Sequence, residues 1–219
     1  MPISAIDGRC LSQILIFIAD EITRREAELN ALDAAVGDGD HGITMRIGFD
    51  AIRERAGQLD SATTIDGILR ESGNAFLSAT GGAIGVVMGK MLMAGGKALQ
   101  GVQDIRAPEF RLLLSSMETS VATTGKVKPG DRTILDAIHA AATAGGSATE
   151  LAAVVDLSAT AAEEAARSTA DMLCRVGRAS RLGTRVLGHP DPGATSFAIM
   201  LRTMHDWIVQ KSNPDQRVA

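Results

Sequence analysis

Three aspartates, Asp33, Asp38 and Asp40, lie close together in the stretch LDAAVGDGDHGITM, which covers residues 32–45. Carboxylates at this spacing repel one another unless water or a cation screens their charge. Carboxylate oxygens are the ligands that Mg²⁺ prefers, and Mg²⁺ commonly completes its shell with substrate phosphates. The two glycines between the aspartates allow the backbone to turn so that the three side chains meet. The residues alone leave two interpretations open: a magnesium site, or a solvated helix cap and turn.

Four other loops have features that suit a phosphate or a nucleotide. SATGGAIG at 78–85 places paired glycines at the start of a helix, where free backbone N–H groups can face an anion. GKVKPGDRT at 125–133 gathers basic residues and an aspartate, GRASRLGTR at 177–185 carries three arginines, and GHPDPGATS at 188–196 precedes another helix. Taken singly, each loop is also typical of an ordinary structural connection. No nucleophile elbow and no P-loop motif is present.

The composition limits the class of protein. The 219 residues are 45% hydrophobic and 22% charged, which is ordinary for a globular protein, and aromatic residues make up only 3%. A net charge of −4 offers no basic face to a nucleic-acid backbone. Cys10 and Cys174 form neither a CxxC pair nor a disulfide framework, so a reducing, cytoplasmic location is expected. No apolar run approaches the roughly 18 residues of a membrane span.

Hydrophobic periodicity predicts an all-α fold. Apolar residues recur at helical spacing, and a capping-box pattern, TAAE, suggests that one helix starts near Ser158. About eight amphipathic helices would bury their apolar stripes by packing antiparallel around a shared interior. One domain over residues 1–219 is expected, with a frayed tail from about residue 211. The expected helices cover residues 11–32, 43–58, 64–77, 83–99, 108–121, 133–144, 158–175 and 194–210.

Read together, the loops resemble those of the nucleotide-binding L subunit of dihydroxyacetone kinases. LDAAVGDGDHGITM, SATGGAIG, GKVKPGDRTILDA and GRASRLGTRVLGHPDPGATS occur in the order and at the separations of that family, from about Leu11 to Leu201. The resemblance implies a closed barrel of eight antiparallel helices. It also implies ADP or ATP at one end of the barrel, with the phosphates held through two Mg²⁺ ions. Asp33, Asp38 and Asp40 match the family's metal-binding aspartates.

The resemblance also implies a set of nucleotide contacts. These are His41, Gly42 and Thr44 in the first loop, Ala83 and Ile84 in the second, Gly125 and Ile134 around the third, and Arg178, Asp191, Pro192 and Gly193 at the adenine and ribose end. Four positions depart from the family's usual residues: Ile84 replaces a serine, Val86 a proline, Thr44 an asparagine and Arg181 a tyrosine. The metal-binding loop itself is intact. The departures therefore concern how the phosphates are held and which K subunit is the partner.

The resemblance implies phosphoryl transfer without a covalent nucleophile in this chain. The subunit would hold the phosphoryl donor, and a separate substrate-binding K subunit would present a small ketose, either dihydroxyacetone or a tetrulose. The nucleotide is either exchangeable ATP or a resident ADP that a phosphoenolpyruvate-dependent phosphotransferase protein rephosphorylates. Two alternatives remain: a nucleotide domain for another acceptor such as a fatty acid, and a non-catalytic nucleotide-binding helical module. The oligomeric state is open, with a homodimer among the options.

Overall fold

Helices account for every regular element in residues 3–59 and 63–212, which are the residues that the computed structural model describes. They comprise nine α-helices and two 3₁₀ segments, and the predicted all-α class is confirmed. The only β-type pairing in these residues is an isolated antiparallel bridge between Ile6 and Ile105. In chain order the elements are α1 (Gly8–Arg24), α2 (Glu26–Ala34), α3 (His41–Gln58), α4 (Ile65–Ala79), α5 (Gly82–Ala98), α6 (Ala107–Gly125), α7 (Ile134–Ala144), α8 (Leu151–Ser168), η1 (Thr169–Asp171), η2 (Arg178–Val186) and α9 (Pro192–Ser212).

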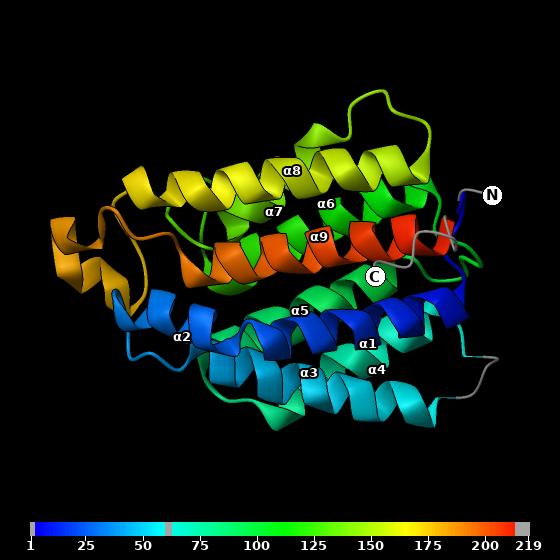
Figure 1. Ribbon diagram of the computed structural model, residues 1–219, viewed down its shortest axis with the longest axis horizontal. Helices are drawn as coiled ribbons and strands as arrows, with labels where there is room; N and C mark the ends of the chain where they lie inside the picture. The colour runs from blue at the N-terminus through cyan, green and yellow to red at the C-terminus, as the bar shows by residue number, and fades with distance from the viewer. Residues whose placement is uncertain (1–2, 60–62, 213–219) are drawn as a thin grey trace.

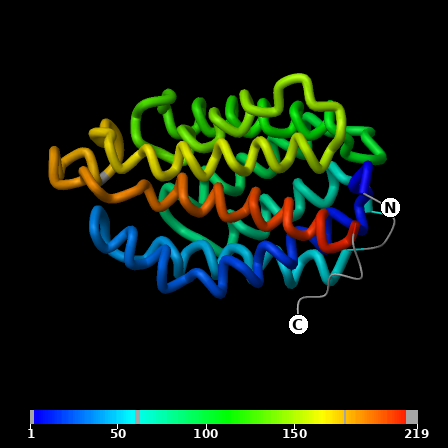
Figure 2. Tube along the Cα trace, turned by 45° about the horizontal axis from the view of Figure 1, so that its top comes forward, coloured from blue at the N-terminus to red at the C-terminus, as the bar shows by residue number. Residues whose placement is uncertain are grey.

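The helices lie side by side along one axis (Figures 1 and 2), and their contacts form a closed ring. Each helix from α3 to α9 packs on the next one along the chain, and α1 closes the ring by packing on both α3 and α9. The interior is filled by aliphatic, methionine and phenylalanine side chains, and Phe49 of α3 meets Phe76 of α4 edge to face with ring centroids 5.7 Å apart. The predicted antiparallel barrel is therefore confirmed.

The first expected helix, over residues 11–32, is broken at Arg25 into α1 and α2. The Thr23 hydroxyl donates to the carbonyl of Ala19 at 2.9 Å, a bond that commonly bends helices. Arg25 then forms ion pairs with Glu21 on one side of the break and Glu28 on the other. The hydrophobic spacing continues across the break, which is why periodicity alone predicted one helix.

The prediction for residues 158–175 is wrong at both ends, because α8 runs from Leu151 to Ser168. The expected cap residue Ser158 is buried in mid-helix, where its hydroxyl donates to the carbonyl of Ala141 on α7 at 3.0 Å. At the other end the chain turns into η1, and the hydroxyl of Thr169 there accepts the backbone N–H of Asp191. A tertiary contact therefore outweighs the local capping pattern.

The alternating chain direction brings one set of helix ends together. Helices α3, α5, α7 and α9 begin at the same end of the barrel, where α2, α4, α6 and α8 end and η2 lies; this is the left end in Figure 1. Helix N-termini offer free N–H groups and a partial positive charge, so this end suits an anionic ligand.

At the opposite end the first and last described residues meet. The backbone N–H of Ile3 donates to the hydroxyl of Ser212, 2.9 Å away. Residues 211 and 212 belong to α9, and the rest of the tail that was expected to fray lies outside the described residues. None of the described helices combines the length and the hydropathy of a bilayer span.

Candidate functional site

The three aspartates converge at the end of the barrel where the odd-numbered helices begin. Asp33 comes from the last turn of α2, and Asp38 and Asp40 come from the loop that leads into α3. One carboxylate oxygen of each residue lies within 4.8 Å of the corresponding oxygens of the other two. Asp33 is half-buried and the other two are exposed. An all-oxygen set of three carboxylates open to solvent fits a hard divalent cation that also keeps water or phosphate ligands.

The loop is folded around the Asp33 carboxylate. Its Oδ2 accepts the backbone N–H groups of Gly39, at 2.9 Å, and Asp40, at 3.0 Å. Gly39 has a φ of +79°, a conformation that side chains with a Cβ rarely adopt. A Cβ on Gly37 would collide with the carboxylate of Asp33. The two glycines are therefore needed to bring the carboxylates together.

Beside Asp33 lies a cavity of about 270 Å³. It is lined by eight of the residues that the sequence predicted for metal or nucleotide: Asp33, His41, Ala83, Ile84, Ile134, Asp191, Pro192 and Gly193. These residues come from the starts of α3, α5, α7 and α9 and from the end of α2. All five predicted loops thus meet around one space, because Arg132 and Thr133 of the third loop and Gly177 and Ala179 of the fourth also line it.

The other predicted residues lie nearby or outside the cavity lining. Gly42 and Thr44 follow His41 on α3, and Gly42 packs so closely on α2 that a Cβ would lie 2.8 Å from Oδ1 of Asn30. Gly125 is the exposed last residue of α6. Arg178 begins η2, but its side chain lies outside the described part of the structure.

His41, the first residue of α3, is a neutral hydrogen-bonding group at physiological pH. Its ring is buried, and Nε2 lies 3.2 Å from the hydroxyl of Ser196 on α9. Burial lowers the pKa of His41 to about 4, although the Asp33 carboxylate and a hydrogen bond to the carbonyl of Pro192 act in the opposite direction. His41 therefore links the starts of α3 and α9 without adding a positive charge.

Asp191 precedes α9 and caps it. Its Oδ2 accepts the backbone N–H of Ala194 at 2.8 Å. Burial raises the pKa of Asp191 to about 6; Arg132 counteracts this rise and Asp136 adds to it. A Cβ on Gly193 would lie 3.1 Å from Asp191 Oδ2 and 3.3 Å from the Cβ of Ile134, so glycine lets α9 approach α7.

Sequence reasoning missed several residues of the cavity wall, above all Arg132. In the sequence it stands among Lys126 and Lys128 in a loop that is equally typical of a solvated surface, yet its side chain is only 1% exposed. Cys174, Val176, Gly177 and Ala179 also line the cavity, from the irregular segment before and at the start of η2. Gly177 and Ala179 belong to the loop at 177–185 that the sequence analysis had already named, whereas Cys174 fell inside the helix predicted over 158–175.

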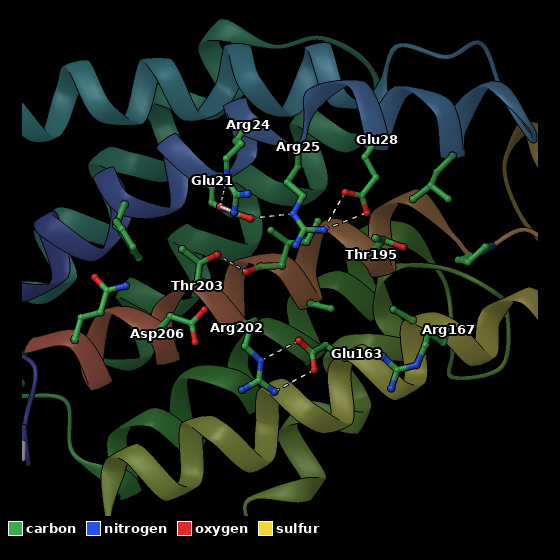
Figure 3. A pocket seen from close by; sticks show the side chains of 17 residues that line it. Glu21, Arg24, Arg25, Glu28, Glu163, Arg167, Thr195, Arg202, Thr203 and Asp206 are labelled. Carbon is green, nitrogen blue, oxygen red and sulfur yellow. Dashed lines mark hydrogen bonds and ion pairs between the residues drawn. The ribbon is translucent and has the colours of Figure 1, made fainter. Parts of the chain in front are cut away.

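A larger hollow of about 540 Å³ lies on the outside of the barrel, over α9 and between α1, α2 and α8. Figure 3 shows Arg25 between Glu21 and Glu28, and Arg202 facing Glu163. Arg25 pairs with Glu21 and Glu28, and Arg202 binds Glu163 through two nitrogens. These opposite charges neutralise one another, so the side chains around the hollow link neighbouring helices through ion pairs. The carboxylate cluster suited to a metal lies at the smaller cavity.

Comparisons with known proteins agree with this geometry. The profile of the DAK2 domain matches residues 35–206. The chain is 33% identical to the ADP-binding subunit DhaL of the PEP-dependent dihydroxyacetone kinase of Escherichia coli K12, over 84% of this chain and 90% of that protein. It is 34% identical to a D-erythrulose kinase of Mycolicibacterium smegmatis, over 92% of this chain but only 36% of that protein.

A solved structure extends the comparison to three dimensions. The dihydroxyacetone kinase of C. freundii in complex with AMP-PNP and Mg²⁺ superimposes with a TM-score of 0.69 at 26% sequence identity. The match covers 94% of this chain and 34% of that one. The chain therefore spans nearly all of the E. coli subunit but about a third of these two kinases.

Proposed function

We propose, from the premise that this chain belongs to the DAK2 domain family of dihydroxyacetone and erythrulose kinases, that it is the nucleotide-binding subunit of a small-ketose kinase. One observation carries the proposal: three carboxylates converge at the barrel end where four helices begin, and one of them, that of Asp33, lines a cavity there. The carboxylates suit divalent cations, and the helix N-termini suit the phosphates that such cations accompany.

Asp33, Asp38 and Asp40 would hold two Mg²⁺ ions. When bound, these ions neutralise negative charge on the nucleotide phosphates. His41, Gly42 and Thr44 would contact the nucleotide from the start of α3, and Ala83 and Ile84 from the start of α5. Gly125 would contact it from the end of α6 and Ile134 from the start of α7, and Arg178, Asp191, Pro192 and Gly193 would enclose the adenine and ribose. The chain contributes binding and orientation, and no covalent nucleophile.

The acceptor would be a small ketose on a separate K subunit, so the chain would be active only in that complex. The E. coli relative supports this arrangement, because its name describes a subunit and this chain covers 90% of it. Dihydroxyacetone is one candidate acceptor, and the erythrulose kinases among the relatives support a tetrulose as the other. The name of the E. coli subunit also supports resident ADP rephosphorylated by a phosphoenolpyruvate-dependent phosphotransferase protein, with exchangeable ATP as the alternative.

The metal-site assignment is tested with Asp38→Asn, which removes one ligand charge at nearly constant volume. Calorimetric titration of ADP in the presence of Mg²⁺ should show a loss of affinity of about tenfold or more. The far-UV circular dichroism should remain that of the wild-type protein. Asp104→Asn is the matched control, because Asp104 lies at the other end of the barrel, before α6, and its variant should bind ADP normally. Wild-type affinity in Asp38→Asn would show that the assignment is wrong.

A further inference from the structure

Arg132 is a buried cation at the junction of two loops of the cavity. It lies between α6 and α7, and its side chain is 1% exposed. One nitrogen, Nη2, donates to the carbonyl of His189 at 2.6 Å and to the carbonyl of Val186 at 3.4 Å. Both carbonyls belong to the segment that leads from η2 to Asp191. A single guanidinium therefore ties the loop before α7 to the loop before α9.

The loop that carries Arg132 is held rigidly on its other side. The Asp131 carboxylate accepts the backbone N–H of Lys128 at 2.9 Å, and the Asp136 carboxylate accepts those of Gly130, at 2.5 Å, and Thr133, at 2.7 Å. Arg132 itself has a φ of +62°, in the left-handed region that residues other than glycine rarely adopt. Such a conformation persists only where surrounding bonds enforce it, and it is frequent at functional sites.

The remaining nitrogens of Arg132 argue against a purely stabilising role. Nε and Nη1 are buried, and neither has a hydrogen-bond partner within the described residues. Burying a charged group with unused donors costs free energy, so an apolar residue at this position would serve packing alone better. The positive charge has a second effect, since Arg132 lowers the pKa of Asp191, which burial raises.

We infer that Arg132 is a positioning residue for the nucleotide, which holds the turn of Asp191, Pro192 and Gly193 against the cavity through the carbonyls of Val186 and His189. This inference rests on the proposed function, because the shape of the turn affects binding only if the cavity takes a nucleotide. Arg132 also supplies the counter-charge that favours the carboxylate form of Asp191. Asp136 of α7 also acts on this carboxyl, and its negative charge opposes the effect of Arg132.

The test compares R132M with R132K in the full chain, using ADP and Mg²⁺ in calorimetric titrations across neutral and mildly acidic pH. R132M should weaken ADP binding about tenfold or more, because charge-assisted bonds that shape the site are lost. R132K keeps the charge and should restore most of the affinity. Without the cation the pKa of Asp191 rises, so the pH dependence of ADP binding should move to higher pH in R132M and stay in place in R132K. A merely structural role would not move this profile.

Arg111→Met is the matched control. The Arg111 guanidinium also donates to loop carbonyls, those of Gly145, Gly146 and Ala148, but at the opposite end of the barrel. This variant should lose thermal stability while its affinity for ADP and the pH profile stay unchanged. If R132M does not fold, R132Q replaces it, because glutamine keeps two N–H donors but no charge.

The outcomes separate the inference from the proposed function. Wild-type protein that fails to bind ADP with Mg²⁺ would overturn the proposed function. Wild-type binding with an unchanged affinity and an unchanged pH profile in R132M or R132Q would overturn the role of Arg132 alone. A weakened affinity that R132K restores, together with the shifted profile, would support it.

Discussion

Asp191→Asn is predicted to stabilise the protein at neutral pH. Asp191 is a half-buried carboxyl whose pKa burial raises to about 6 from the ordinary 3.8. The unfolded chain ionises this group without that cost. Asparagine can still accept the N–H of Ala194, because it caps helices as well as aspartate does. The substitution therefore removes the cost of the buried charge and keeps the cap.

The magnitude follows from the two pKa values. A tenfold change in acidity is worth about 1.4 kcal/mol, so the difference between 3.8 and about 6 corresponds to about 3 kcal/mol at most. For the sign, the folded protein binds more protons than the unfolded chain between about pH 4 and about pH 6. The free-energy cost of ionising Asp191 in the folded protein therefore grows as the pH rises through this interval and is complete above about pH 7.

Urea denaturation followed by circular dichroism measures this difference. The gain in the free energy of unfolding for Asp191→Asn should approach about 3 kcal/mol near pH 7.5 and fall below about 1 kcal/mol near pH 4. Asp171→Asn, a substitution of the same type at an exposed residue of η1, should change the free energy by less than about 0.5 kcal/mol at either pH.

The same variant should bind ADP with Mg²⁺ more weakly than the wild type, since Asp191 is one of the proposed nucleotide contacts. A residue that lowers stability in the free protein yet supports binding is typical of functional sites. The reasoning about the buried charge would be refuted if the variant were no more stable than the wild type near pH 7.5. It would also be refuted if the free energy of unfolding increased by the same amount near pH 4.

Three further substitutions test the packing, the phosphate loop and the outer ion pairs. Gly48→Ala should cost about 1–3 kcal/mol in urea denaturation, because the added Cβ would collide with the Phe76 ring; an unchanged midpoint would contradict this packing. Ile84→Ser should tighten ADP binding about threefold to tenfold in calorimetry, because a hydroxyl at the cavity wall can donate to phosphate; no gain would place the phosphates elsewhere. Arg202→Met should lower the free energy of unfolding by about 1 kcal/mol, since its ion pairs with α8 are partly exposed, and it should leave ADP affinity intact; a loss of affinity would link the outer hollow to the site.

The barrel could be predicted from the sequence because helical periodicity is a local signal that tertiary packing reinforces. The expected helix over 64–77, for example, corresponds to α4 at Ile65–Ala79. The carboxylate cluster was equally accessible, because its residues lie within one short stretch of sequence, residues 33–40. Where the predictions failed, a contact between distant segments was decisive: Ser158 bonds to α7 in the middle of α8 instead of capping it.

The role of Arg132 could not be predicted for the same physical reason. Lys128, Pro129 and Gly130 just before it are exposed, and only the path of the segment between η2 and α9 places the carbonyls of Val186 and His189 against its guanidinium. The loop that carries Cys174 is likewise placed by contacts across the barrel end: the Arg175 N–H donates to the carbonyl of Asp131, 3.3 Å away. The spacing of residue types in the sequence predicts neither contact.

The central claim is that the three aspartates and the adjacent cavity form a metal-dependent nucleotide site. The most direct measurement is calorimetric titration of ADP into the wild-type protein, with Mg²⁺ and again with EDTA, after mass spectrometry has shown whether nucleotide remains from purification. We expect saturable binding of one ADP per chain that requires Mg²⁺. A folded, nucleotide-free sample that binds no ADP under either condition would contradict the account.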